Sequence, residues 1–166
     1  MLTAKTILIG YDNSEGSRRA IAAAGELFPG YRAIVLHVWS PVSLMVAAYG
    51  GMVALPTYDD NVLQEGAKKF AEEGCRLAIG AGLRAQPESA EVTYRGTWYT
   101  ILEVADQYGA EVIVLGARGL SGFKSMMLGS VSHSVSQHAH VPVLVVPPSE
   151  HEELAAEPAA HAAASA

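Results

Sequence analysis

Glycine, hydroxyl and basic residues gather in one stretch of the sequence, between Glu111 and Pro147. An apolar, β-branched run over 112–115 predicts a buried strand. The loop after it contains four glycines and two cations: Gly116, Arg118, Gly119, Gly122, Lys124 and Gly129. Ser130 and Ser132 then open a segment of helical periodicity. Glycine lets a backbone approach a ligand closely, and a helix N-terminus attracts phosphate. The stretch therefore predicts a phosphate-binding loop, and the alternative is an ordinary strand-to-helix connection capped by Ser130.

The spacing of these residues resembles the nucleotide signature of the universal stress protein family. Gly116-x-x-Gly119 is followed by nine residues and then by Gly129-Ser130, which matches the G-2x-G-9x-G-S motif of the ATP-binding branch. The resemblance covers Lys5 to Val146 and includes K-T-I-L-I-G-Y-D-N-S at the start, L-H-V at Leu36 to Val38 and the closing H-V-P-V-L-V-V-P. It implies a three-layer αβα sandwich with a five-stranded parallel sheet in the order 3-2-1-4-5, a Rossmann-like fold of the adenine nucleotide alpha hydrolase-like type.

The resemblance also implies a role for each residue of the site. Beside the adenosine part would lie Tyr11, Asp12, Val38 (through its backbone N–H and C=O) and Gly116. Leading to the phosphates and cradling them would be Arg118, Gly119, Gly129, Ser130, Val131 and Ser132. The cofactor would be ATP, with ADP or AMP as alternatives, and Mg or Mn would accompany the phosphates. From the residues alone, Asp12 could instead be a turn residue, and Ser132 a plain first-turn serine.

Strands and helices must alternate along the chain to position these residues. Apolar and alternating runs predict five strands: Lys5–Gly10, Tyr31–Val38, Glu88–Tyr94, Val112–Leu115 and Val141–Val146. Ser14 and Thr97 should cap two of the helices. The helix that starts near Asp59 should bury Leu63, Ala67, Phe70, Gly74, Leu77 and Ala78. Ligands of a parallel sheet bind where the strand order reverses, so Asp12 and Gly116 should face each other across a crevice.

Composition and charge exclude several classes of protein. With 166 residues, half of them hydrophobic, one universal stress protein domain is expected over 1–148, and a low-complexity, disordered tail over 149–166. The net charge of −6 argues against a nucleic-acid partner. Residues 33–58 lack charged side chains, but prolines and glycines interrupt them, so an apolar loop is expected there and no membrane insertion. The single cysteine, Cys75, cannot form an internal disulfide, which fits a reducing cytoplasm.

The motifs that are missing narrow the function further. The sequence contains no GxxxxGK[ST] loop, no GxGxxG fingerprint and no GxSxG elbow, and no nucleophile or general base stands out. We interpret the chain as an ATP-binding regulatory module of a stress response. The alternatives are a slow ATPase or another nucleotide-using enzyme of the same fold, and an assembly protein with a vestigial site. The resemblance implies a homodimer that pairs the last strand, Val141–Val146, with its copy.

Overall fold

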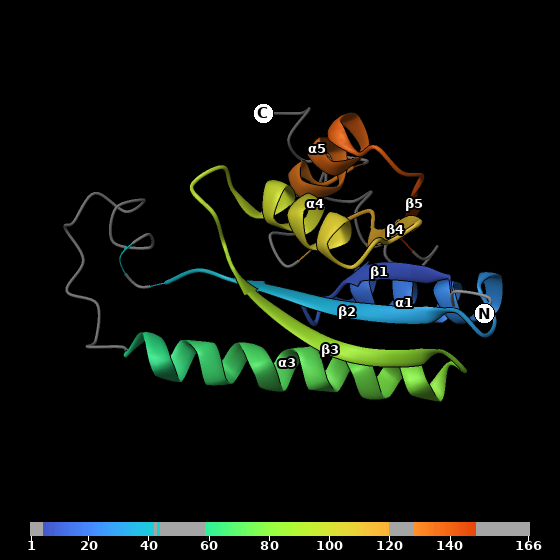
Figure 1. Ribbon diagram of the computed structural model, residues 1–166, viewed down its shortest axis with the longest axis horizontal. Coiled ribbons are helices and arrows are strands. Elements are labelled where there is room, and N and C mark those ends of the chain that lie inside the picture. The colour runs from blue at the N-terminus through green and yellow to red at the C-terminus, as the bar shows by residue number, and fades with distance from the viewer. Residues whose placement is uncertain (1–4, 42, 44–58, 120–127, 149–166) are drawn as a thin grey trace, which may run out of the picture.

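A five-stranded parallel sheet forms the centre of the computed structural model, which describes residues 5–41, 43, 59–119 and 128–148. The strands lie in the order β3-β2-β1-β4-β5 (Figure 1). Their bounds are β1 (Thr6–Gly10), β2 (Arg32–Trp39), β3 (Arg84–Glu91), β4 (Val112–Gly116) and β5 (Val143–Val146). The predicted α/β class and strand order are confirmed.

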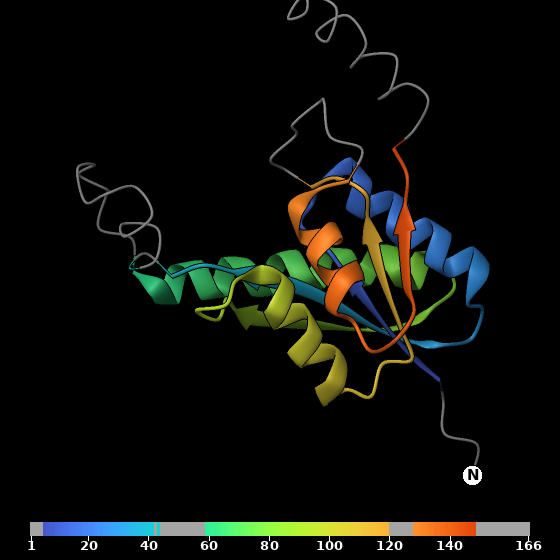
Figure 2. The ribbon, with the colours of Figure 1, turned by 90° about the horizontal axis from the view of Figure 1, so that it is seen from above.

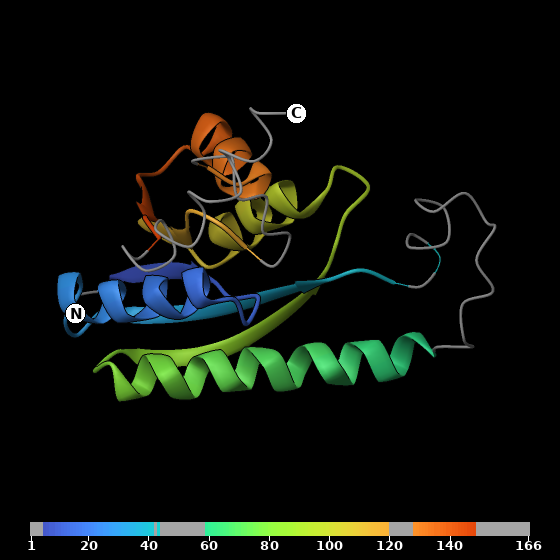
Figure 3. The same ribbon diagram turned by 180° about the vertical axis from the view of Figure 1, so that it is seen from behind.

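In the part of the chain that the structure describes, two pairs of helices cover the two faces of the sheet. On one face lie α1 (Glu15–Leu27) and α3 (Asp60–Gly80), and on the other lie α4 (Thr97–Gln107) and α5 (Ser130–His138). Figures 1 and 3 show α3 along one side of the strands and the pair α4 and α5 along the other. Figure 2 shows α1 beside β4 and β5, which it contacts. None of the helices in the described ranges has the length and apolar character that a membrane crossing requires.

Alternation along the central strands builds a separate core on each face. In β1, Ile7 and Ile9 point into the core beneath α1 and α3, whereas Leu8 points into the core beneath α4 and α5. In β4, Val114 and Ile113 divide between the two cores in the same way. All five side chains are fully buried. Because both faces of these parallel strands are covered, the strands need nearly continuous apolar runs, which is the pattern that predicted them.

The long helix α3 buries small side chains and exposes large ones. Its buried residues are Ala67, Ala71, Gly74, Cys75 and Ala78. Phe70 and Leu77 were predicted to be buried, but they are 40% and 37% exposed, and Leu63 is only partly buried. Small side chains let the helix axis approach the sheet closely, so the larger ones flank the contact. Burial raises the pKa of the Cys75 thiol, the one cysteine of the chain.

The third strand begins earlier than the sequence suggested. β3 starts at Arg84, four residues before the predicted Glu88, and it ends at Glu91. Pro87 therefore lies inside the strand, opposite Val35 of β2. Proline is tolerated here because β3 lies at an edge and, among the described strands, pairs only with β2, so the missing N–H can lie on the open side. The prediction that this strand lies at an edge is confirmed.

Two other predicted boundaries also differ from the structure. The N-cap of α4 is Gly96, whose φ is +97°, so Thr97 is the first helical residue and not the cap. β5 starts at Val143 instead of Val141, although the carbonyl of Pro142 still accepts a hydrogen bond from Ile113 N–H at 3.0 Å. The expectations for the loop after Pro41 and for the tail from 149 lie outside the described residues.

Candidate functional site

A crevice of about 270 Å³ opens at the carboxyl ends of β1, β2 and β4. All ten residues that the sequence assigned to the site line it: Tyr11, Asp12, Val38, Gly116, Arg118, Gly119, Gly129, Ser130, Val131 and Ser132. The crevice lies at the point of the sheet where the strand order reverses, between β1 and β4, as expected for a ligand site of an open parallel sheet. The structure thus brings together segments that are far apart in the sequence.

Backbone crowding fixes the glycine loop against the start of α1. An ideal Cβ at Gly116 would lie 2.5 Å from the carbonyl carbon of Gly16, and one at Gly16 would lie 2.4 Å from the carbonyl oxygen of Arg118. These are contacts between two backbones, which no rotamer change can relieve. Glycine at both positions is therefore required for the end of β4 to pass directly beside the N-terminus of α1.

The first turn of α5 forms one end of the crevice. Its N-cap is Gly129 and not Ser130, and Gly129 makes no side-chain cap. The backbone N–H of Gly129 donates to Ala117 O at 2.6 Å, which brings the two ends of the loop together. Because the first N–H groups of a helix have no partner within the helix, this end presents donors and partial positive charge to the crevice, beside Ser130 and Val131.

Ser132 holds α5 against the end of β4. Its hydroxyl is buried and donates a hydrogen bond to the carbonyl oxygen of Gly116 at 2.8 Å. The proton of this hydroxyl is thus directed at the protein backbone, and Ser132 shapes the α5 end of the crevice in addition to lining it. This role differs from that of a plain first-turn serine.

The opposite part of the crevice is apolar. Leu36 and Val38 of β2, Ile101 of α4 and Leu115 of β4 all line it. Of these, sequence reasoning assigned only Val38 to the site. Ile101 was predicted to point inward, but no local pattern indicates that α4 starts beside the end of β2. A flat heterocyclic ring fits such a surface, because it can bury both of its faces against aliphatic side chains.

Asp12 combines a turn role with a place in the crevice. Its Oδ1 accepts hydrogen bonds from Ser14 N–H at 3.0 Å and from the Ser14 hydroxyl at 2.5 Å. Ser14 in turn caps α1 by accepting from Ser17 N–H at 3.2 Å, as predicted. The other oxygen of Asp12, Oδ2, lies on the side of Gly119, where a Cβ would come within 2.5 Å of it. The carboxylate therefore lies between α1 and the glycine loop.

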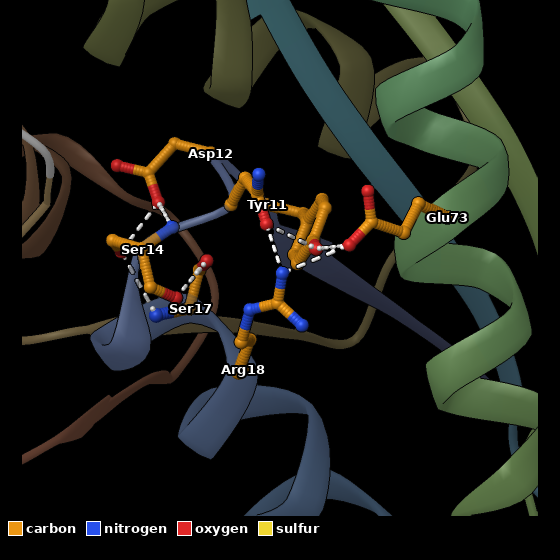
Figure 4. A network of polar contacts seen from close by, with 7 residues as sticks. Tyr11, Asp12, Ser14, Ser17, Arg18 and Glu73 are labelled. Carbon is orange, nitrogen blue, oxygen red and sulfur yellow. Dashed lines mark hydrogen bonds and ion pairs between the residues drawn. The ribbon is translucent and has the colours of Figure 1, made fainter.

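Tyr11 lines the crevice, yet its phenol points to α3 (Figure 4). The hydroxyl lies 3.0 Å from Glu73 Oε1 and 3.1 Å from Asn13 Oδ1. Arg18 Nη2 donates to the same Glu73 oxygen at 2.9 Å and also to Asn13 Oδ1. Sequence reasoning missed Glu73 and Arg18, because Glu73 is 62 positions from Tyr11 and no motif joins them.

A Tyr11→Phe variant tests this buried phenol through the pH dependence of stability. Burial, followed by the bond to Glu73, raises the pKa of Tyr11 from 10.0 to about 12. The protonated phenol thus stabilises the fold below pH 10, and this contribution is lost as the pH rises from 10 toward 12. We expect the variant to unfold at a free energy about 1 kcal/mol lower at pH 8, with a difference that shrinks above pH 10. Urea unfolding from pH 8 to 11.5 measures it.

The exposed Tyr94 is the control for this measurement. Its side chain is 92% exposed, so Tyr94→Phe should change the unfolding free energy by less than about 0.5 kcal/mol at pH 8. A Tyr11→Phe difference that stays constant across the pH range would contradict the assignment of the raised pKa to the buried phenol.

The chain is similar to known proteins in both sequence and fold. The model of the universal stress protein family matches residues 3–147. The universal stress protein YxiE of Bacillus subtilis is 35% identical over 84% of this chain and 97% of its own length. A universal stress protein of Thermus aquaticus is 32% identical over 86% of this chain and 98% of its own length.

Solved structures match the fold over most of the chain. The structure of the hypothetical protein MJ0577 has a TM-score of 0.70 at 24% identity and covers 90% of this chain and 99% of its own. A universal stress protein in complex with cAMP has a TM-score of 0.59 at 25% identity, with 87% and 98% covered. The universal stress protein of Archaeoglobus fulgidus in complex with dAMP has a TM-score of 0.61 at 21% identity, with 88% and 99% covered. The sequence matches and this shared fold show that the chain belongs to the universal stress protein family.

Proposed function

We propose that this chain binds ATP in the crevice and acts as a nucleotide-dependent regulatory module of a stress response. The observation that carries the proposal is the two-part lining of the crevice. Aliphatic side chains form one part, and the glycine loop with the N-terminus of α5 forms the other. An adenine ring suits the first part and phosphates suit the second. A relative at 25% identity was solved with cAMP, which supports an adenine nucleotide.

The residues present fit ATP at each part of the site. The backbone of Val38 would hold the adenine, Asp12 would lie beside the ribose, and Arg118 with the first turn of α5 would hold the phosphates. Gly116 and Gly119 let the loop pass close to Gly16 and to Asp12, where a Cβ would collide with them, so the backbone of the loop borders the crevice. Mg or Mn would neutralise phosphate oxygens when it accompanies the nucleotide. Within the described residues, no three His, Cys, Asp or Glu side chains are grouped to hold a metal ion. ADP or AMP would occupy the same site with fewer phosphate contacts.

Hydrolysis of ATP would be slow at such a site. Asp12 is the only carboxylate among the described residues that line the crevice. It already accepts two hydrogen bonds from Ser14, so it is poorly placed to activate a water molecule. A binding and signalling role therefore fits these residues better than a dedicated ATPase.

The experiment that tests the proposal identifies the resident ligand. Protein purified without added nucleotide is denatured, and the released small molecules are identified by chromatography and mass spectrometry. Calorimetric titration with ATP, ADP, AMP and cAMP, with and without magnesium, follows. ATP released in near-stoichiometric amount, or ATP as the tightest ligand, supports the proposal. Release of ADP together with turnover of fresh ATP would favour the ATPase alternative, and no binding of any nucleotide would overturn the proposal.

A Ser130→Asp variant tests the phosphate end of the site. Its carboxylate would stand at the start of α5 and repel the phosphates, so we expect ATP to bind about ten-fold more weakly or worse. The affinity for AMP should fall less than the affinity for ATP, because AMP carries fewer negative charges. Gln137→Glu is the matched control, because it adds the same charge to the exposed last turn of the same helix. Calorimetry compares the two variants. Equal losses of ATP and AMP affinity would contradict this placement of the phosphates.

We also propose a homodimer through the last strand. Among the described strands, β5 pairs only with β4, so its other edge is open to a second strand. Val143, Leu144 and Val145 are only partly buried within one copy of the chain. Pairing of two β5 edges across a two-fold axis would cover this edge, including the segment from Val141 that precedes the strand.

A Val145→Asp variant is expected to be monomeric where the wild type is a dimer. Val145 belongs to neither core of the single chain, so the charge should act on the interface before it acts on folding. Size-exclusion chromatography with light scattering measures the mass. Val62→Asp makes the same change at a position of α3 that is 62% exposed, and it should leave the mass unchanged. A Val145→Asp protein that remains dimeric would refute this interface.

A further inference from the structure

A polar network joins α1, α3 and the turn after β1 around the Tyr11 hydroxyl (Figure 4). Glu73 of α3 is its centre, because one of its oxygens lies 3.0 Å from the Tyr11 hydroxyl and 2.9 Å from Arg18 Nη2. Arg18 and the Tyr11 hydroxyl both also contact Asn13 Oδ1. Four side chains from three segments thus meet around one carboxylate and one amide oxygen.

This network contacts the turn that contains Asp12. Asn13 has a φ of +63° and is the only non-glycine residue with positive φ in the described part of the chain. This left-handed conformation is disfavoured for a residue with a side chain, so the contacts of its amide oxygen help to hold it. Asp12 precedes Asn13 directly. The conformation of Asn13 therefore decides how Asp12 is presented between Ser14 and the glycine loop.

Tyr11 is itself fixed at its backbone, so its side chain is a rigid link. Its N–H donates to Leu36 O at 2.8 Å. Its carbonyl oxygen lies 2.8 Å from His37 Nδ1, and the His37 ring packs against Phe70 of α3 at a centroid distance of 5.2 Å. The two partners of the Tyr11 backbone, Leu36 and His37, both belong to β2, and Leu36 lines the crevice together with Val38. These contacts hold the backbone of Tyr11 in place on β2, between α3 and the turn.

A close helix contact brings Glu73 within reach of the turn. Its neighbour Gly74 lies flat against the Tyr11 ring, where an ideal Cβ would come within 2.7 Å of Tyr11 Cδ1. A larger residue there would move α3 away and draw Glu73 from the phenol. The geometry of α3, which lies outside the lining of the crevice, is therefore matched to the polar network.

We propose that Glu73 and Arg18 are positioning residues of the nucleotide site, which act through Tyr11 and Asn13 to hold Asp12 in its binding orientation. The inference rests on the proposed function, because it deepens the account of the same site. It makes α3 a part of the site's geometry although no α3 residue lines the crevice. Affinity for the adenosine part of a nucleotide then depends on a carboxylate in the second layer of side chains.

The test measures calorimetric affinity for ATP and AMP in graded variants of Glu73. Glu73→Ala removes both contacts, and we expect about five-fold weaker binding of both nucleotides. Glu73→Gln keeps an acceptor for the Tyr11 hydroxyl and should recover part of the lost affinity. If Glu73 only stabilised the fold, all variants would bind equally well at a temperature where all of them are folded. Arg18→Met removes the partly exposed partner on α1 and should weaken both nucleotides similarly.

Two further variants decide whether the effect runs through Asp12. In an Asp12→Asn background, adding Glu73→Ala should weaken binding by less than about two-fold. Glu65→Gln is the matched control, because it removes an exposed ion pair of the same helix, with Lys68 at 2.7 Å, and it should leave binding unchanged. Circular dichroism confirms folding of each variant at the temperature of the titration.

The outcomes separate this inference from the proposed function. If the wild type binds ATP or AMP and the folded Glu73→Ala and Arg18→Met proteins bind equally well, the positioning role is overturned. The proposed function then still stands. A loss that persists in full in the Asp12→Asn background also overturns the positioning role, because Glu73 would then act by another route. Wild type that binds no nucleotide overturns the proposed function and this inference together.

Discussion

A Gly116→Ala variant is expected to bind ATP about ten-fold more weakly or worse and to lose about 1–3 kcal/mol of unfolding free energy. The new Cβ would lie 2.5 Å from the backbone of Gly16, so either the start of α1 or the glycine loop must move. Either movement disturbs the bond from Ser132 to the Gly116 carbonyl and the donors at the start of α5. Calorimetric titration and urea unfolding measure the two losses.

Gly10→Ala is the matched control for this prediction. Gly10 ends β1 as Gly116 ends β4, and both line the crevice. Among the described residues beyond its chain neighbours, the Cβ of alanine at position 10 would meet Leu115 Cδ2 alone, at 2.5 Å. That atom is the tip of a flexible side chain and can rotate away, so the cost should stay below that of Gly116→Ala. Equal effects of the two variants would show that crowding of the backbone is not the cause.

Gly74→Ala and Gly66→Ala are expected to change stability in opposite directions, although both lie in α3. At position 74 the Cβ would lie 2.7 Å from Tyr11 Cδ1 and 2.8 Å from Val35 Cγ1. Both neighbours are buried, so we expect a loss of about 1–3 kcal/mol. At position 66 an added Cβ would meet no atom of the described residues within 4 Å beyond its own turn of helix, and alanine should add about 0.5–1 kcal/mol through its greater helix propensity.

Urea unfolding of the two glycine variants gives the comparison directly, because intrinsic propensity contributes to both. The same pair also tests the link from α3 to the crevice. ATP affinity should fall for Gly74→Ala, since α3 moves away from Tyr11, and should be unchanged for Gly66→Ala. A stable Gly74→Ala protein would mean that α3 can shift without cost, and it would remove the close packing as the reason for glycine at this position.

The fold was predictable from sequence because its central strands are buried on both faces. Apolar runs such as Ile7–Ile9 leave few alternatives to a covered parallel strand. The part of the crevice formed by the glycine loop and the start of α5 was predictable for a similar reason. Its residues lie close together in the sequence, and the spacing from Gly116 to Ser130 is itself a local pattern. Asp12 and Val38 were placed only through the family resemblance, because nothing local links them to the loop.

The parts that were missed depend on contacts between distant segments. The hydrophobic periodicity of the sequence does not show that α3 presents Ala71 and Cys75 to the sheet and turns Phe70 partly outward. The sizes of the side chains that face each other decide which side of the helix packs against the sheet. The edge position of β3 made Pro87 acceptable, and that depends on the strand order. The pairing of Tyr11 with Glu73 needs the folded chain, because a glutamate on an amphipathic helix is ordinarily a solvated residue.

The buried thiol of Cys75 can serve as an intrinsic probe for movement of α3 relative to the sheet. It is the one cysteine in the sequence, it is 7% exposed on the inner side of α3, and burial raises its pKa. Alkylating reagents attack thiolates that solvent can reach. The rate of labelling therefore reports how often α3 separates from the sheet. Mass spectrometry of that single modification can therefore follow the helix in an unmodified protein, with no engineered probe.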